Sequence, residues 1–293
     1  MAIVLITGGT GLVGKHLTKL LIKKNHEVRI LSRNPSKKNE FKWDISRNYL
    51  DEKSLVNIDY IIHLAGAGIA EKKWTDKRKK VIIDSRVESA NLLFKKVKEL
   101  NINLKGYISA SGTGFYGTVT SEKIYNEEDT HANDFLGKVC LAWENSAHQF
   151  KNLKIPLTIL RTGIVLTKQG GALEKMKTPI ISPLGSGKQY IPWIHIDDLC
   201  NLYLMPIENN LIGVYNAVAP EIHNGISFSK TLAKVFKKPF IPINVPSFLL
   251  KLLFGEMANI LLKGSRVSSK KIEKNGGYSF RFSILKKALI NLT

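Results

Sequence analysis

Short apolar runs alternate with longer amphipathic stretches along the first half of the chain. The runs are rich in Ile, Val and Leu and have the length of buried strands, whereas the stretches between them carry apolar residues at helical spacing. The strands predicted from this pattern are Ile3–Thr7, Glu27–Leu31, Glu40–Trp43, Tyr60–Leu64, Tyr107–Ser111 and Leu157–Arg161. The helices predicted between them are Leu12–Lys24, Asp76–Leu100 and Phe135–Phe150. This alternation indicates an α/β fold with a doubly wound parallel sheet of the Rossmann type.

The alternation breaks after the last of these strands. Residues 163–194 are rich in Gly, Pro and Lys, which indicates an excursion from the sheet, before a helix (Ile196–Ile207) and one more strand (Val214–Ala217). The pattern is then mainly helical. We therefore expect a Rossmann domain of residues 1–162, completed by 195–217, and a small, mainly helical C-terminal lobe. The lobe takes residues 163–194 and 218–293, over the carboxyl ends of the strands, where open α/β sheets bind ligands.

The composition is that of a globular protein, with 44% hydrophobic residues. The two cysteines, Cys140 and Cys200, have neither disulfide nor metal-ligand spacing, and glycines interrupt the apolar run at residues 2–6, so we expect a cytoplasmic protein without a bound metal. The stretch Phe248–Leu262 is apolar, but Lys251 and Glu256 interrupt it, so it does not predict a membrane span. We expect a pair of core helices there, with a membrane-surface helix as the alternative.

The chain is strongly basic, with a formal charge of +20 from 44 Lys and Arg against 24 Asp and Glu. Such a charge is compatible with nucleic-acid binding. The lysines, however, are scattered along the chain, and no aromatic and basic residues interleave as they do in nucleic-acid-binding motifs. A nucleic-acid partner is therefore the weaker prediction, and a small-molecule ligand is the stronger one.

Three glycines follow the first strand and open the first helix. Gly8 allows a tight turn, Gly11 lets a pyrophosphate approach the backbone, and Gly14 lets the helix pack closely on the strand. The helix N-terminus then offers free N–H groups and a positive dipole end to the phosphates. The spacing therefore predicts a dinucleotide-binding loop, with contacts from Gly8, Thr10, Gly11, Leu12, Val13 and Gly14.

The end of the second strand indicates which dinucleotide is bound. An acidic residue there would accept from the ribose 2′-hydroxyl of NAD, but the chain has Ser32 and Arg33 instead. Ser32 can donate to a 2′-phosphate, and Arg33 can pair with it and stack on adenine, which favours NADP(H); the alternative is a solvated surface arginine. Asp44, at the end of the third strand, could accept from the adenine amino group or could cap a helix.

A series of short segments, spread in order over nearly the whole chain, matches one known family. The segments are Thr7–Gly14, Ser32-Arg33, His63–Gly66, Asp84–Arg86, Ser109–Ser111, Tyr116-Gly117, Phe135-Leu136, Trp143-Glu144, Arg161–Gly163, Gly170–Leu173, Leu184–Gly187, Trp193–Leu199, Asn216–Pro220 and Phe254–Met257. They resemble the extended, atypical short-chain dehydrogenase/reductases called epimerase-family proteins, within the NAD-dependent epimerase/dehydratase superfamily, which carry a characteristic C-terminal domain. The resemblance implies a Rossmann sheet with NADP(H) across the strand ends.

The resemblance also implies cofactor contacts beyond the glycine loop. Ser32 and Arg33 match such positions, as do Leu64, Ala65 and Gly66, which lie where the fourth strand ends beside the pyrophosphate and nearer ribose. Arg86, on the long helix, could reach a phosphate or could be a surface charge.

Catalysis in the wider superfamily uses a Tyr and a Lys one helical turn apart, together with a Ser on the preceding strand. Ser111 matches the serine, but the Tyr–Lys pair is missing: the two possible alignments place Phe135 and Val139, or Leu136 and Cys140, at those positions. Tyr116 is the nearest replacement acid, with an aromatic lining of the nicotinamide pocket as the alternative. We expect Glu144 to form a structural pair rather than act as a base.

Several polar residues remain between the sheet and the lobe. We expect Asp197 or Asp198 to cap the helix that follows them, and His195 to help hold the lobe rather than act as a catalyst. We expect Arg161, Gln189 and Trp193 to face the substrate; an arginine there suits an anionic compound.

Three hypotheses about function follow. The first is an NADP(H)-dependent oxidoreductase acting on an unidentified small molecule, with Ser111, Tyr116 or a water handling the proton. The second is a non-enzymatic NADP(H)-binding sensor or partner-binding protein, which would account for the missing Tyr–Lys pair. A nucleic-acid binder is the third and weakest. Oligomerisation is compatible with all three.

Overall fold

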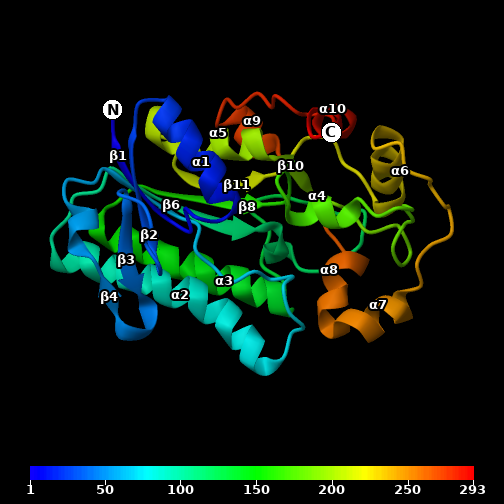
Figure 1. The fold of residues 1–293 in the computed structure, drawn as a ribbon, viewed down its shortest axis with the longest axis horizontal. Coiled ribbons are helices and arrows are strands. Elements are labelled where there is room, and N and C mark those ends of the chain that lie inside the picture. The colour runs from blue at the N-terminus through cyan, green and yellow to red at the C-terminus, as the bar shows by residue number, and fades with distance from the viewer.

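An eight-stranded, mostly parallel sheet forms the centre of the computed structural model, which describes residues 1–293 (Figure 1). Its strands are β1 (Ile3–Thr7), β2 (Glu27–Ser32), β3 (Glu40–Asp44), β4 (Tyr49–Leu50), β5 (Tyr60–His63), β6 (Gly106–Gly112), β8 (Leu157–Thr162) and β11 (Gly213–Ala217). The strand order is β11-β8-β6-β5-β1-β2-β3-β4, and only β4 runs antiparallel to its neighbour. The chain places β2, β3 and β4 on one side of β1 and then crosses to add β5 on its other side. Ligands are therefore expected at the carboxyl ends of β1 and β5.

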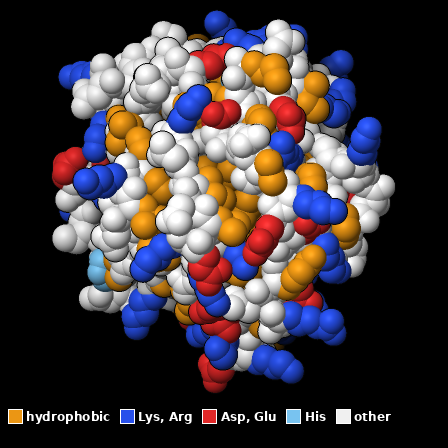
Figure 2. Space-filling view, turned by 90° about the vertical axis from the view of Figure 1, so that its left-hand side faces the viewer, with side chains coloured by type: hydrophobic (Ala, Val, Ile, Leu, Met, Phe, Trp, Pro, Cys, Tyr) orange, Lys and Arg blue, Asp and Glu red, His pale blue; other side chains and the backbone are white.

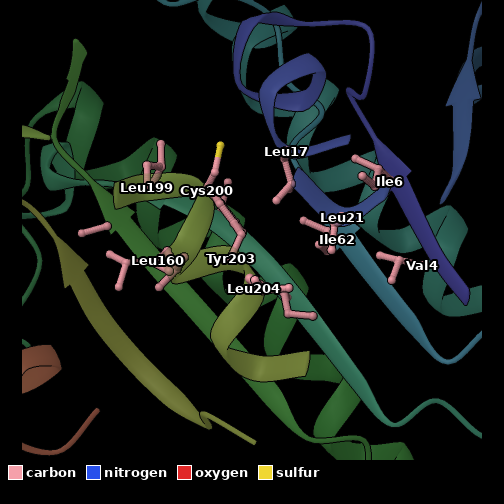
Figure 3. Packing of buried hydrophobic residues seen from close by; sticks show 14 of the residues in the cluster. Val4, Ile6, Leu17, Leu21, Ile62, Leu160, Leu199, Cys200, Tyr203 and Leu204 are labelled. Carbon is pink, nitrogen blue, oxygen red and sulfur yellow. The ribbon is translucent and has the colours of Figure 1, made fainter. Parts of the chain in front are cut away.

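Two pairs of helices cover the faces of the sheet. Helices α1 (Leu12–Lys23) and α5 (Ile196–Glu208) lie on one face, and α2 (Asp76–Glu99) and α3 (Phe135–His148) on the other (Figure 1). Because side chains alternate along a strand, Val4 and Ile6 pack toward α1 and α5 whereas Leu5 packs toward α2. Figure 3 shows the first of these cores, where Leu17, Leu21, Leu199, Tyr203 and Leu204 meet Ile62 and Leu160.

These elements confirm the predicted α/β, doubly wound fold. The predicted strands and helices are all present, with ends that differ by a few residues. The pattern missed β4 and two small two-stranded sheets, β9 (Ile164–Leu166) with β10 (Trp193–His195), and β7 (Ile124–Tyr125) with β12 (Arg266–Val267). Strands of two or three residues are too short to show an alternation, so only tertiary pairing reveals them.

The lobe beyond the carboxyl ends of the strands is mainly helical (Figure 1). Its helices are α4 (Gly171–Met176), α6 (Gly225–Val235), α7 (Ser247–Phe254), α8 (Asn259–Leu262), α9 (Lys270–Lys274) and α10 (Leu285–Asn291). Helices α6 and α10 share a core with Leu166 and Trp193. Ile272 of α9, in contrast, packs into the core under α1 and α5, so the C-terminal segment also contacts the Rossmann domain.

The apolar stretch Phe248–Leu262 is not a pair of core helices, and that prediction was wrong. Helix α7 buries only Leu250, and most of its other apolar side chains are exposed. The apolar residues of the stretch outnumber the positions that can face the protein, so they extend around the surface of the helix. None of the helices has both the length and the apolar character needed to cross a bilayer.

Candidate functional site

The glycine loop between β1 and α1 has no space for larger side chains at two of its positions. Gly8 has φ of +71°, and a Cβ there would lie 3.0 Å from the backbone of Leu64 and Ala65. A Cβ on Gly14 would lie 2.3 Å from the Gly8 carbonyl oxygen. The loop is therefore pressed against the end of β5 on one side and against the first turn of α1 on the other, as the spacing predicted.

The first turn of α1 presents free backbone donors. The helix is preceded by Gly11, which offers no side-chain cap, and no acidic residue lies in its first turn. The N–H groups of Leu12, Val13 and Gly14 have no backbone acceptor, and the side chain of Thr10 is exposed beside them. Free N–H groups and the positive end of the helix dipole make this turn suited to an anion such as a pyrophosphate.

A buried histidine joins the ends of β1 and β5. The Thr7 hydroxyl lies 2.7 Å from Nδ1 of His63 and accepts from the Ala65 N–H at 3.2 Å. On the other side of the ring, Nε2 lies 3.2 Å from the Ser89 hydroxyl and 3.4 Å from the Arg86 carbonyl oxygen. Burial lowers the pKa of His63 to about 4, so the ring is neutral near pH 7. These bonds fix the turn of Leu64, Ala65 and Gly66 against the glycine loop.

Arg86 lies beneath that turn, and it is not the surface charge that the sequence left open, because its side chain is only 6% exposed. Its Nη1 donates to the carbonyl oxygens of Ala67 and Ile82, and its guanidinium lies 4.8 Å from the ring centroid of Trp143. No carboxylate pairs with it, and Nε has no partner. Burial lowers the pKa of Arg86 to about 10, which still leaves it charged at neutral pH.

Two basic residues, Arg33 and Lys42, lie at the carboxyl end of β2. Ser32 is buried and accepts from the Asn34 N–H, whereas Arg33 is exposed. Lys42 of β3 lies in register with Ser32, and its Nζ donates to the Arg33 carbonyl oxygen. Sequence reasoning missed Lys42, although the parallel pairing of β2 with β3 places it there.

Asp44 lies at the end of β3 and caps the 3-10 helix η1 (Ile45–Arg47). Its carboxylate accepts from the Ser46 N–H at 3.1 Å and from the Ser46 hydroxyl at 2.6 Å, and the hydroxyl bond lowers the pKa of Asp44. The capping alternative is therefore confirmed. A groove of about 480 Å³ runs between η1 and α2 beside it, lined by Val81, Ser85 and Leu92 among others.

A buried charge pair lies behind the end of β6. The Ser111 hydroxyl donates to Oε1 of Glu144 at 2.7 Å, and Arg161 of β8 donates to both carboxylate oxygens of Glu144 at 2.9 Å. All three side chains are buried. The expectation that Glu144 forms a structural pair is confirmed, because both of its oxygens are held by a bidentate arginine.

Tyr116, in the 3-10 helix η3 (Thr113–Tyr116), joins the same network. Its hydroxyl donates to Oδ1 of Asn216 at 2.7 Å and accepts from Nη1 of Arg161 at 3.0 Å, and the side chain is 1% exposed. Burial raises the pKa of Tyr116 to about 12. A phenol with this pKa and with both hydrogen-bonding positions occupied is suited to positioning Arg161 rather than to proton transfer near neutrality.

Two network members, Asn216 and Glu127, were not singled out from the sequence. The Asn216 N–H donates to Oε1 of Glu127 at 2.7 Å, its side-chain amide donates to the Ser268 carbonyl oxygen at 3.1 Å, and burial raises the pKa of Glu127. Asn216 lies in a segment that carries the family resemblance, but no sequence signal marks Glu127.

The helix that carries the Tyr–Lys pair in the wider superfamily has no acid or base at either alignment. Phe135 packs its ring 4.7 Å from that of Trp74, with Nζ of Lys79 5.3 Å from the Phe135 centroid. Val139 and Cys140 are buried. Phe135 and Val139 carry no titratable group, and burial raises the pKa of Cys140 to about 12, so these positions cannot transfer a proton near neutrality.

The three side chains expected at the substrate are buried, and each donates hydrogen bonds within the protein. Arg161 is held by Glu144, as described above. Gln189 is buried and donates to the carbonyl oxygens of Leu184 and Leu261, and Trp193 is buried and donates to the Glu221 carbonyl oxygen at 3.0 Å. The bonds of Gln189 and Trp193 join segments of the lobe to one another, whereas those of Arg161 lie within the Rossmann domain.

The expected helix cap at Asp197 or Asp198 was wrong. The N-cap of α5 is His195, whose Nδ1 accepts from the Asp197 N–H at 3.1 Å. Asp198 is fully buried and instead accepts from the Tyr278 hydroxyl and from the N–H groups of Arg281 and Phe282. Helix α5 therefore begins before Asp198, and that carboxylate is free to bind the C-terminal segment.

Comparisons with known proteins agree with this geometry. Residues 4–217 match the model of the NAD dependent epimerase/dehydratase family, and residues 245–292 match a domain of unknown function, DUF1731. An epimerase family protein of Staphylococcus aureus is 36% identical over 298 residues, which cover 98% of each chain.

Two solved structures share the fold. Human epimerase family protein SDR39U1, solved with NADPH, has a TM-score of 0.87 and 29% identity over 99% of this chain and 98% of that chain. A nucleoside-diphosphate sugar epimerase from Corynebacterium glutamicum has a TM-score of 0.79 and 30% identity over 98% of this chain and 57% of that chain.

Proposed function

Because the chain belongs to the NAD-dependent epimerase/dehydratase family, we propose that it is an NADP(H)-dependent oxidoreductase acting on a small molecule. The observation that carries the choice of NADP(H) is the end of β2, where Arg33 follows Ser32, Lys42 lies in register with Ser32, and no acidic side chain follows the strand. Two cations beside a hydroxyl suit a 2′-phosphate, whereas NAD binding uses a carboxylate there. The NADPH in the human relative supports the same choice.

The remaining contacts follow the carboxyl edge of the sheet. The pyrophosphate would lie on the free N–H groups at the start of α1, beside Gly8 and Gly11. Leu64, Ala65 and Gly66 would contact the nearer ribose, with the charge of Arg86 beneath them favouring the phosphates. The groove between η1 and α2 would take the adenine.

The reacting end would lie at Ser111. NADP(H), when bound, supplies or accepts the hydride. Ser111 donates its hydrogen to Glu144, so its oxygen offers acceptor lone pairs to a substrate hydroxyl. A water in the site would take the proton that this hydroxyl loses when it is oxidised, because Tyr116 and Glu144 are already bonded within the protein. Arg161 keeps Glu144 in place, and Tyr116 in turn positions Arg161.

The test of this proposal is a comparison of dissociation constants for NADPH and NADH by calorimetry. We expect wild-type protein to bind NADPH at least about tenfold tighter, because each charge-assisted bond to the extra phosphate contributes about 1.5 to 3 kcal/mol. Arg33→Ala and Lys42→Ala should each remove much of this preference. Lys38→Ala, which removes an exposed charge from the same β2–β3 connection, should keep it. Equal affinities of wild-type protein for the two cofactors would refute the assignment of the 2′-phosphate site.

A second candidate function is that of a non-enzymatic NADP(H) sensor. It is favoured by the apolar residues at both alignments of the Tyr–Lys pair and by the occupied hydroxyl of Tyr116. A screen of carbonyl compounds and sugar nucleotides with NADPH separates the two functions. Robust turnover that Ser111→Ala abolishes supports the oxidoreductase, whereas tight NADPH binding without turnover of any compound supports the sensor.

A further inference from the structure

Helix α7 exposes an apolar surface with no counterpart in the rest of the lobe. Phe248 is 66% exposed, Leu252 76% and Leu253 60%, and Ile243, just before the helix, is 75% exposed. Within the helix, Phe248 and Leu252 lie one turn apart, as do Leu249 and Leu253. These four helix side chains form one continuous apolar stripe. Exposed apolar stripes of this kind mark surfaces that contact another molecule.

The stripe is held outward by bonds at both ends of the helix. Before α7, the Val245 N–H donates to the Pro183 carbonyl oxygen, and the Gly185 N–H donates to that of Val245. After it, Glu256 pairs with Lys79 of α2 at 2.5 Å. Leu250, which flanks the stripe beside Leu253, is the buried contact of the helix. The exposure of the stripe is therefore a consequence of how α7 is anchored.

The charged side chains of the segment from α7 to the residue after α8 are mostly basic. Residues 247–263 contain Lys251 and Lys263 and a single acidic residue, Glu256, which is already paired. Both lysines are exposed, and neither has a carboxylate within ion-pair distance. Apolar side chains flanked by unpaired lysines are typical of helices that lie in the surface of an anionic bilayer.

We propose that α7 docks this protein onto anionic lipid bilayers, with Phe248, Leu249, Leu252 and Leu253 entering the headgroup region. Lys251 lies at the edge of the stripe, where its long side chain can extend back to the lipid phosphates. A second copy of the chain is a poorer occupant, because facing copies would bring Lys251 of each together, on chains that each carry +20. The helix is too short to span the bilayer, so the association is peripheral and reversible.

Vesicle flotation with the full-length protein tests this proposal. We expect binding to vesicles with about 30% phosphatidylglycerol and at least about tenfold weaker binding to pure phosphatidylcholine, at about 0.15 M salt. Replacing Phe248, Leu252 and Leu253 together by Ser should weaken binding to the anionic vesicles at least about tenfold. These side chains are exposed, so the fold should be retained, which circular dichroism would verify.

A matched control removes the same kind of side chain elsewhere. Ile22, Val56 and Ile212 are 54%, 55% and 56% exposed. They precede β2, β5 and β11, so they lie near the amino ends of the sheet strands and away from α7. Replacing these three together by Ser should leave vesicle binding within about twofold of wild type. Equal binding by both triple variants and wild type would overturn the proposal, because it would show a general attraction by the +20 charge.

Two further measurements distinguish the lipid bilayer from other molecules that could cover the stripe. In Phe248→Trp, brominated lipids in anionic vesicles should quench the added fluorescence, and absence of quenching would overturn the proposal. Light scattering without vesicles should give the same mass for wild type and the α7 triple variant. A wild-type dimer that the triple variant converts to monomer would assign the stripe to a second copy and also overturn it.

Discussion

The space around Gly14 excludes any residue that carries a Cβ. A Cβ there would lie 2.3 Å from the Gly8 carbonyl oxygen and 2.5 Å from the Gly9 Cα, and both atoms belong to backbone that cannot rotate away. We predict that Gly14→Ala lowers the free energy of unfolding by about 1 to 3 kcal/mol, the cost of overpacking. Denaturant titration would measure it. Gly112→Ala is the control, because a Cβ at Gly112 would meet its nearest atom at 3.7 Å; a similar loss in both variants would contradict the prediction.

The residues around Ser111 show what a sequence conceals at the same scale. Ser111 and Tyr116 were identified as candidates from their positions near the end of a strand. Their hydrogen-bond partners, Glu144 and Asn216, come from α3 and β11. Whether a hydroxyl is free to act on a substrate or already bound depends on those partners, so the proposed division between a catalytic Ser111 and a positioning Tyr116 required the fold.

At the scale of elements, His63 is the contact that joins β1, β5 and α2. Burial lowers the pKa of His63 to about 4, from 6.5 in the unfolded chain, so unfolding releases a ring that binds a proton more readily. Stability should therefore be complete above pH 6.5 and should decrease as the pH falls from 6.5 to 4. Each pKa unit corresponds to 1.36 kcal/mol, so the contribution of this ring amounts to about 3 kcal/mol.

The prediction is tested by urea unfolding of His63→Asn between pH 4 and 8. The variant should be less stable than wild type at pH 7, because the bonds to Thr7 and Ser89 are disturbed, but it should lose about 3 kcal/mol less on acidification. His16→Asn, on the surface side of α1, should keep the wild-type pH dependence. A parallel decline of stability in His63→Asn and wild type would show that the ring is not the titrating group.

At the scale of the whole molecule, Asp198 holds the C-terminal segment against α5. Its buried carboxylate accepts from the Tyr278 hydroxyl at 2.7 Å and from the Arg281 and Phe282 N–H groups at 2.9 Å. We predict that Asp198→Asn lowers the free energy of unfolding by about 2 to 3 kcal/mol. The asparagine amide has one acceptor oxygen, whereas the carboxylate accepts from three donors. Hydrogen exchange should show faster exchange at residues 278–282.

Asp197→Asn is the matched control. Asp197 is partly exposed and forms loose contacts, with Arg281 at 3.6 Å and with Nδ1 of His195 at 3.9 Å, so its loss should change stability by less than about 1 kcal/mol. Equal effects of the two substitutions would contradict the anchoring role of Asp198.

The +20 charge is also a property of the whole molecule. On the face drawn in Figure 2, Lys and Arg side chains are spread around the surface and are interspersed with Asp and Glu, while apolar side chains gather near the centre. A nucleic-acid-binding protein gathers its basic residues into a patch or stripe. This face therefore offers a general attraction for polyanions and no track for a nucleic-acid backbone.

The sequence by itself determined the order of strands and helices, the glycine loop and the absence of an acid after β2. These features are local: the period of apolar residues and the conformational freedom of glycine act within one or two turns of chain. Only the tertiary structure decided that Lys42 lies beside Ser32, that Glu144 and Asn216 occupy the hydroxyls of Ser111 and Tyr116, and that α7 is exposed. Strand register, burial and hydrogen-bond partners depend on residues far apart in the chain, so they cannot be predicted from a local sequence pattern.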